Sequence, residues 1–246
     1  MIPKIEFKTM SLEDNIDIIK WAYREKYGVS PAHGYTIKLF PELNNLGDIS
    51  DEELDNRIEE VVTKYYNDNK DQLRGNASEY AEVWNEYNDK YLNTLSSYFG
   101  VEWKTDIITC TVGIIPIFPR YLDEYGFCLG RFIDNENVLR ICAHEILHFK
   151  WFEKWKELYP DTRREEYDSP YRIWKYSEMV TDPVLNNKPF TDIHIFNERA
   201  YDEFYTYEKD GILVMDYLRE LYSKDITIEE KITKGFDYIK DIVDNT

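Results

Sequence analysis

One nine-residue segment limits the fold of this chain more than any other part of the sequence. Residues 141–149 read Ile-Cys-Ala-His-Glu-Ile-Leu-His-Phe, so two histidines and one glutamate stand among residues without charge. This pattern suits a mostly buried helix. Because a buried ionisable group needs a compensating partner, His144, Glu145 and His148 are expected to share one.

The spacing of the two histidines indicates what that partner is. Residues four positions apart lie on one helix face, with Cβ atoms about 6 Å apart. Two imidazoles at that spacing can bind one metal ion at about 2.0–2.1 Å. Glu145 lies about a quarter turn away, so it can accept a proton from a metal-bound water without binding the metal itself. The His-Glu-x-x-His motif therefore predicts a zinc site at His144 and His148 with Glu145 as general base.

A third ligand is predicted from the geometry of a helix hairpin. The helix of the motif is expected to end near Tyr159, and the next helix to start at Pro170 after a polar loop. The first helix then runs about 16 Å beyond His148, and the second runs about 12 Å back to Glu178. A catalytic zinc takes three protein ligands and keeps one open position, so Glu178 is the predicted third ligand, with Asp182 or another acid as the alternative.

Asp182 lies one helical turn beyond Glu178. A carboxylate there can accept the second N–H of a ligand histidine and so fix the orientation of its ring. Pro183 follows directly and disfavours a helical conformation for Asp182. The other acids nearby lie off the histidine face or at the far end of the hairpin: Glu153, Asp161, Glu165 and Glu166.

These residues resemble a known group of enzymes. HEILH at 144–148 followed by SEMVTD at 177–182 is similar to the gluzincin metallopeptidases, which share a thermolysin-like core, and especially to the compact cytosolic minigluzincins. The resemblance covers about residues 107–185. It implies a Zn²⁺-dependent peptidase with Glu145 as base and proton shuttle and Asp182 beside the ligands. The ligands that it implies are His144, His148 and Glu178.

The same resemblance implies a fold. The chain would be α+β, mostly helical and zincin-like, with a small twisted sheet packed on the helix of the motif. An edge strand of that sheet would pair with an extended peptide substrate, and residues 125–133 are the candidate. The alternative for these residues is an ordinary structural strand. Catalysis also needs a donor for the developing oxyanion. Candidates are Tyr171 and His194, with Tyr176 and Tyr201 also near the ligand helix.

The rest of the chain is predicted as two lobes. Residues 1–105 form a helical lobe and residues 106–246 the metal-binding catalytic lobe. Helices are expected at 11–27, 50–69, 78–99, 134–159, 170–182, 198–222 and 227–243, and strands at 35–40, 107–118 and 125–133. Ser11 and the pair Thr227 and Glu230 are the predicted caps, and Gly28 and Gly100 the predicted stops.

Net charge and cysteine content limit the kinds of binding partner and the cellular setting that we expect. The net charge of −18 argues against binding to nucleic acid or to an anionic membrane surface. The N-terminus lacks a signal-peptide pattern, and no apolar run is long enough for a membrane span. The three cysteines Cys110, Cys128 and Cys142 are widely spaced, so neither a disulfide framework nor a zinc ribbon is indicated. A cytoplasmic setting and a peptide or protein substrate are the expectation.

Two other interpretations stay open. Two histidines and one carboxylate also suit non-haem iron, which would make the chain a different metal enzyme. The motif could also hold a structural zinc or belong to a latent, binding-only relative. A structural site is usually closed by four protein ligands, and no fourth ligand is evident in the sequence.

Overall fold

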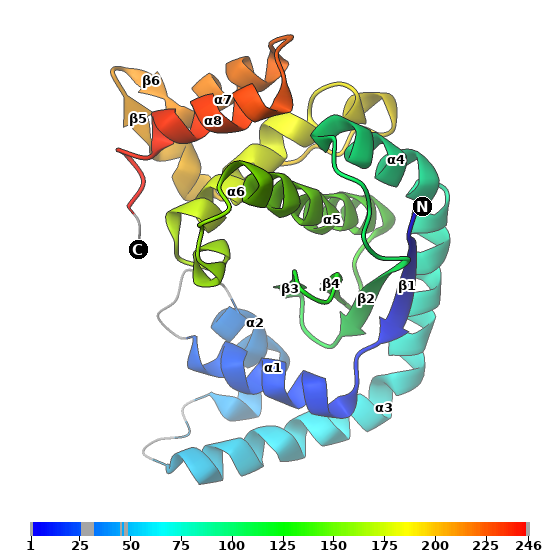
Figure 1. Ribbon diagram of the computed structural model, residues 1–246. Coiled ribbons are helices and arrows are strands. Elements are labelled where there is room, and N and C mark those ends of the chain that lie inside the picture. The colour runs from blue at the N-terminus through cyan, green and yellow to red at the C-terminus, as the bar shows by residue number, and fades with distance from the viewer. Residues whose placement is uncertain (1, 26–31, 45, 47–48, 245–246) are drawn as a thin grey trace. The chain divides into compact units, whose positions relative to one another are not determined.

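The computed structural model describes residues 2–25, 32–44, 46 and 49–244 (Figure 1). The chain is mostly helical with a small sheet, which confirms the α+β class. It divides into two compact units. Unit 1 comprises Met1–Pro3, Trp84–Asp106 and Leu139–Thr246, and unit 2 comprises Lys4–Val83 and Ile107–Val138. The units interleave along the sequence, so the first 105 residues contribute to both.

Unit 2 contains a four-stranded sheet of order β1-β2-β4-β3. The strands are β1 (Lys4–Thr9), β2 (Ile107–Gly113), β3 (Arg120–Tyr121) and β4 (Gly126–Gly130). β2 pairs in parallel with both β1 and β4, and β3 is antiparallel to β4. Gly130 passes very close to the connection after β2, because a Cβ there would lie 2.6 Å from the Cα of Pro116.

Two of the longer strands of this sheet, β1 and β2, differ from the sequence prediction. β1 was not expected, although residues 4–9 alternate charged with apolar or small side chains, the period-2 pattern of a strand. β2 ends at Gly113 rather than at Phe118. Pro116 and Pro119 lack the N–H that a sheet ladder needs, which is consistent with this early end.

The helices of unit 2 enclose their own apolar core. They are α1 (Leu12–Arg24), α2 (Ala32–Leu39) and most of α3 (Asp51–Asn85), with a 3-10 turn at Pro41–Leu43. The Ser11 hydroxyl accepts a hydrogen bond from the Asp14 amide at 3.0 Å, which confirms the predicted cap. The predicted stop at Gly28 lies outside the described residues.

The strand predicted at residues 35–40 is wrong, because α2 occupies this segment. Ala32, Thr36 and Phe40 are all buried, and they recur every four residues as a helix in contact with a core requires. Packing of that face outweighs the strand preference of the aromatic and β-branched residues in between. α3 likewise runs unbroken through residues 70–77, where a gap between two helices was expected.

Unit 1 is helical apart from a short hairpin. Its helices are α4 (Asn88–Phe99), most of α5 (Asn135–Leu158), α6 (Arg172–Leu185), α7 (Val214–Ser223) and α8 (Ile228–Ile239). The hairpin strands are β5 (Glu208–Lys209) and β6 (Ile212–Leu213), and 3-10 turns lie at Arg164–Tyr167, Phe190–Asp192 and Asp202–Thr206.

α5 is the helix around which unit 1 packs. The Tyr91 hydroxyl of α4 donates a hydrogen bond to the Ala143 carbonyl of α5 at 2.6 Å. Rings of α5 also contact α6 and α8, with centroid distances of 5.5 Å for Trp151 and Tyr176 and 4.8 Å for Trp155 and Phe236. Figure 1 shows α5 running beside α6, with α7 and α8 next to α6. This packing holds the face of α5 that carries the histidines against α6.

Several predicted helix ends in unit 1 are confirmed. Gly100 ends α4 in the left-handed conformation with φ of 64°, and Thr227 and Glu230 form the predicted capping box of α8. Three predictions are wrong. α6 begins at Arg172 rather than at Pro170, and it continues through Pro183 to Leu185, so Asp182 is helical. The segment from residue 198 becomes a regular helix only at Val214.

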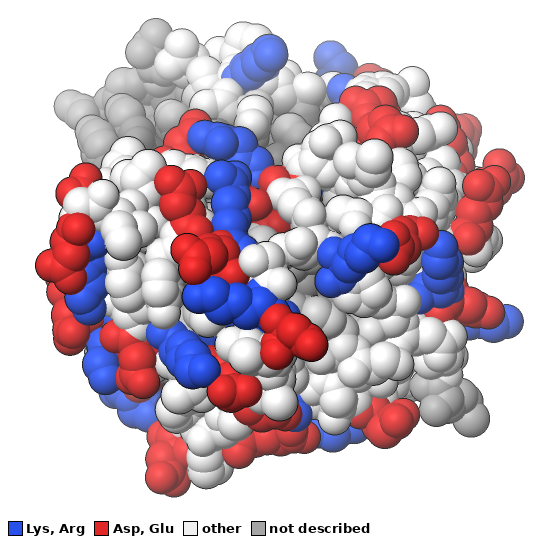
Figure 2. All heavy atoms as spheres, turned by 90° about the horizontal axis from the view of Figure 1, so that it is seen from above, with Lys and Arg blue, Asp and Glu red and all other residues white. Residues whose placement is uncertain are grey.

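No helix among the described residues combines the length and the apolar character that crossing a bilayer requires. Cys110, Cys128 and Cys142 are buried, and none of them forms a disulfide among the described residues. Figure 2 shows one face of the molecule, on which acidic and basic side chains are intermixed. The described part of that face therefore carries no continuous basic surface of the kind that binds phosphate backbones.

Candidate metal centre

Three side chains of unit 1 converge on one point. They are His144 and His148, one turn apart on α5, and Glu178 on α6, and their ligand atoms all lie within 4.8 Å of one another. The two Nε2 atoms are 3.1 Å apart. Glu178 Oε2 lies 3.1 Å from Nε2 of His144, and Glu178 Oε1 lies 3.4 Å from Nε2 of His148. The hairpin of α5 and α6 thus brings the predicted ligands together.

These distances match those of a metal site. In a tetrahedral site with zinc–ligand distances near 2.0–2.1 Å, neighbouring ligand atoms are about 3.3 Å apart. A carboxylate offers only lone pairs, and a neutral imidazole offers one lone pair. Three such donors facing one another repel unless a proton or a cation lies between them. The residues therefore fit a zinc ion in both distance and donor type.

Without a metal, charge stabilises the same arrangement. Burial lowers the pKa of His144, but the Glu198 charge and the hydrogen bonds to Glu178 and Glu198 outweigh it and raise this pKa well above its usual value. Burial raises the pKa of Glu178, but the two histidines outweigh it and hold this pKa well below its usual value. Both shifts favour a protonated His144 beside an ionised Glu178 when no metal is bound.

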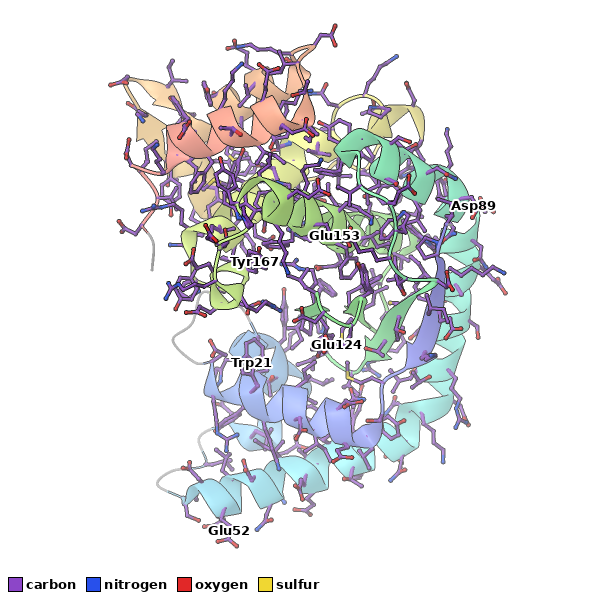
Figure 3. All side chains as sticks on the ribbon, in the orientation of Figure 1. Trp21, Glu52, Asp89, Glu124, Glu153 and Tyr167 are labelled. Atoms are coloured by element: carbon purple, nitrogen blue, oxygen red, sulfur yellow. The ribbon has the colours of Figure 1, made fainter. Side chains whose placement is uncertain are left out.

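Aromatic packing fixes the second histidine. The His148 side chain is 0% exposed, whereas 16% of the His144 side chain is exposed. The His148 ring stacks on Phe152 at a centroid distance of 6.0 Å, and Phe152 contacts Tyr167 at 4.8 Å. Figure 3 labels Tyr167, which lies in the 3-10 turn between α5 and α6. Solvent therefore contacts the cluster at His144, while His148 belongs to the core.

Glu145 follows His144 on α5 and is buried, with 5% of its surface exposed. A carboxylate next to a ligand histidine and shielded from bulk water is suited to take up a proton close to the metal position. The general-base role of Glu145 stays a prediction from the motif.

Sequence reasoning missed Glu198, a carboxylate that contacts a proposed ligand. Its Oε1 lies 2.9 Å from Nδ1 of His144, on the side of the ring away from the metal position. Its Oε2 lies 3.4 Å from Nη1 of Arg140 on α5. The residue before it, Asn197, has a φ of 50°, the left-handed region that asparagine tolerates better than most residues. Asn197 was therefore a local signal for a turn directly before the helix expected from residue 198.

Asp182 contacts other residues than the histidines. Its carboxylate accepts hydrogen bonds from Arg219 Nη2 at 2.8 Å and from Asn186 Nδ2 at 2.9 Å, and it also accepts one from the Tyr205 hydroxyl. Asn186 in turn accepts a hydrogen bond from the Glu198 amide at 3.0 Å. Asp182 is therefore linked to His144 through Asn186 and Glu198.

The two expected oxyanion donors lie in different surroundings. Tyr171 caps the start of α6, seven residues before Glu178, which is about 10 Å along a helix axis. His194 packs against the rings of Tyr87 and Phe196 at centroid distances of 5.5 and 5.2 Å. Of the other two tyrosines considered, Tyr176 is buried with its hydroxyl 3.1 Å from the Ile232 carbonyl, and Tyr201 is exposed.

Three of the four competing acids, Glu153, Glu165 and Glu166, pair with basic residues. Glu153 on α5, labelled in Figure 3, accepts a hydrogen bond from Lys150 Nζ at 2.6 Å. Glu165 and Glu166 both pair with Arg163 in the connection between α5 and α6. Within the described residues, the one histidine, cysteine and carboxylate cluster with metal-binding geometry is that of His144, His148 and Glu178.

The candidate substrate strand lies in unit 2. Residues 126–130 form β4, which pairs with β2 along its length and with the two residues of β3 on its other side. Beyond β3, the Cys128 amide donates to the Pro119 carbonyl at 3.0 Å. β4 is therefore an inner strand, and β3 lies at this edge of the sheet, which contradicts the edge position predicted for residues 125–133.

Comparisons of the chain with protein-family models, with curated proteins and with solved structures find no match. The class that site and fold define is accordingly coarse: an α+β protein with a His-His-Glu cluster suited to a divalent metal.

Proposed function

We propose that this protein is a zinc-dependent hydrolase that cleaves peptide bonds. His144, His148 and Glu178 hold the zinc ion, and Glu145 is the general base. The observation that carries the proposal is the convergence of two Nε2 atoms and one carboxylate at distances of 3.1–3.4 Å, on a helix where Glu145 follows the first histidine.

A bound zinc ion would supply Lewis acidity, which polarises a carbonyl group and lowers the pKa of a water molecule. Glu145 accepts the proton of the attacking water and passes it to the leaving amine. Because Glu145 is buried, its proton stays at the site between these two transfers. The packing of α5 on α6 holds His148 and Glu178 in place. Three protein ligands would leave one coordination position of a bound zinc ion for water and substrate.

The remaining features of the proposal come from the sequence. The HEILH and SEMVTD motifs resemble the gluzincin peptidases, and a zincin-like arrangement with a sheet over α5 belongs to that resemblance. The three buried cysteines form no disulfide among the described residues, which supports the proposal of a reducing, cytoplasmic setting. Tyr171 and His194 remain proposed oxyanion donors that would have to approach the site when a substrate binds.

The first experiment is elemental analysis of the untagged protein, comparing the wild type with Glu178→Ala. About one zinc per chain in the wild type and much less in the variant is the expected result for a three-ligand site. A wild type that binds no zinc after reconstitution would contradict the hydrolase. Iron in place of zinc, with oxygen-dependent chemistry, would favour the non-haem iron alternative that the same donor set allows.

Cleavage is tested next with a peptide library, using Glu145→Gln as the control for contaminating peptidases. Products formed by the zinc-loaded wild type but not by this variant would support peptide hydrolysis. Full zinc occupancy without any cleavage would instead favour a latent or binding-only relative.

A further inference from the structure

Glu198 occupies a position that neither the motif nor the proposed mechanism assigns. Its side chain is 0% exposed, and it approaches His144 from the opposite side of the ring to Glu178. A buried carboxylate is costly unless it is paired. Here both oxygens have partners, Nδ1 of His144 at 2.9 Å and Arg140 at 3.4 Å.

The contact between Glu198 and His144 determines which ring nitrogen of a neutral His144 carries the proton. A carboxylate can only accept a hydrogen bond, so Nδ1 of His144 must carry a proton to pair with Glu198. A neutral imidazole has a single N–H, and its other nitrogen, Nε2, then presents a lone pair. Nε2 is the atom that lies 3.1 Å from both Glu178 and the second histidine. Glu198 thus directs the lone pair of His144 at the metal position.

Glu198 is itself held in place by Arg140 and by two backbone hydrogen bonds with Asn186. Arg140 lies on α5 one turn before His144, so the same helix supplies both the ligand and the cation beside Glu198. The Glu198 amide donates to Asn186 Oδ1 at 3.0 Å, and Asn186 Nδ2 donates to the Glu198 carbonyl at 2.8 Å. Asn186 follows α6, the helix of Glu178. The carboxylate is therefore fixed with respect to both ligand helices.

We propose that Glu198 is the positioning residue of the metal centre: it holds His144 in the Nδ1–H tautomer and aims Nε2 at the metal. This inference rests on the proposed zinc site, and it assigns to Glu198 the role that sequence reasoning gave to Asp182. Asp182 instead supports the arrangement indirectly, through its hydrogen bond from Asn186.

The test compares zinc affinity, by competition with a chelator, in the wild type and in Glu198→Gln, Asp182→Asn and Glu203→Gln. Glu203 is an exposed carboxylate of the same unit and serves as the matched control. We expect Glu198→Gln to bind zinc about 10–100-fold more weakly, because partners of a ligand histidine contribute by this factor. Glu203→Gln should match the wild type, and Asp182→Asn should lose less affinity than Glu198→Gln.

A second readout separates positioning from simple loss of structure. Nitrogen-15 spectra of the histidine rings in the zinc-loaded wild type should show two rings bound through Nε2, and the Nδ1 proton of His144 should exchange faster with solvent in Glu198→Gln. The metal-free variant should still melt cooperatively. A melt that has lost its cooperativity would overturn the positioning role, since Glu198 would then be needed for the fold itself.

Three outcomes of the zinc-affinity measurement decide whether Glu198 has this role. A wild type without zinc overturns the proposed hydrolase and the role of Glu198 together. Zinc bound equally well by the wild type and Glu198→Gln overturns the role of Glu198 alone and leaves the hydrolase standing. A greater loss in Asp182→Asn than in Glu198→Gln returns the positioning role to Asp182.

Discussion

Glu145 is the residue whose replacement most directly separates metal binding from chemistry. It belongs to the motif but is not among the three converging ligands. We expect Glu145→Gln to keep about one zinc per chain and to lose about 10²–10⁴-fold in peptide cleavage, the range typical of a general base. Elemental analysis and kcat/KM on a cleaved peptide measure the two quantities. Loss of zinc together with activity would instead make Glu145 part of the metal-binding set.

Zinc binding should depend on pH through His144. Its pKa in the metal-free protein is raised well above the usual value, so at neutral pH the ring holds a proton that zinc must displace. Zinc affinity is expected to rise about tenfold per pH unit up to that pKa and then to level off. The low pKa of Glu178 keeps this carboxylate out of the competition.

The stability of the metal-free protein should respond in the opposite direction. A group whose pKa is raised in the folded state stabilises that state fully at any pH below its pKa in the unfolded chain, which is about 6.5 for histidine. That contribution disappears as the pH rises through the pKa of folded His144. Denaturant titrations of the metal-free protein at several pH values measure the trend in stability. Calorimetry of zinc binding in two buffers with different ionisation enthalpies measures the protons that zinc displaces. Zinc binding without proton release near neutral pH would contradict a protonated His144 in the metal-free protein.

At the scale of single residues, the sequence predicts much of the candidate site, but not all of it. The two histidines and Glu178 come together because their positions depend on helix geometry, which is local and regular. Glu198 was not predicted, because it follows an irregular segment whose path depends on tertiary contacts. No periodic pattern marks where such a segment returns to a ligand.

At the scale of the helices, Gly235 controls how closely α8 approaches α6. A Cβ at this position would lie 2.1 Å from the hydroxyl oxygen of Tyr176, which is fully buried. Alanine usually stabilises a helix by about 1 kcal/mol relative to glycine. Here we expect Gly235→Ala to lower the free energy of unfolding by about 1–3 kcal/mol, because the core becomes overpacked.

Urea unfolding measures that change, and Tyr176→Phe provides the matched background. Removing the hydroxyl relieves the closest contact, so Gly235→Ala should cost less in the Tyr176→Phe protein than in the wild type. Equal costs in both backgrounds would mean that the hydroxyl does not limit the approach of α8. A stabilised Gly235→Ala protein would contradict the close packing of these helices.

The elements were predicted where local signals are strong. The Ser11 cap, the Gly100 stop and the Thr227–Glu230 capping box each depend on a few neighbouring residues, and all three are present. Errors arose where packing decides. The sequence predicts a strand where α2 lies, and α6 continues through Pro183 although proline removes one backbone hydrogen bond of the helix there.

For the molecule as a whole, zinc should act as a stabilising ligand. A ligand present at 100 times its dissociation constant adds about 2.7 kcal/mol to the free energy of unfolding. We expect the Tm to rise with zinc concentration in the wild type and to remain unchanged in Glu178→Ala. An equal rise in both proteins would indicate that zinc binds elsewhere.

Hydrogen exchange can locate this stabilisation. All three proposed ligands lie in unit 1, so zinc should slow amide exchange in α5 and α6 more than in β1 and β2 of unit 2. The control is again the Glu178→Ala protein, in which zinc should change exchange in neither unit. Uniform protection of both units would instead show that they unfold as one cooperative body.

The interleaving of the two units also affects how the chain can reach this structure during synthesis. Unit 1 draws on three separate stretches of sequence, and α3 and α5 each begin in unit 2 and end in unit 1. A ribosome would release His144 and His148 well before Glu178 and Glu198. Until then a nascent chain exposes two histidines without the acids that complete their surroundings, so the metal centre can form only after translation has passed residue 198.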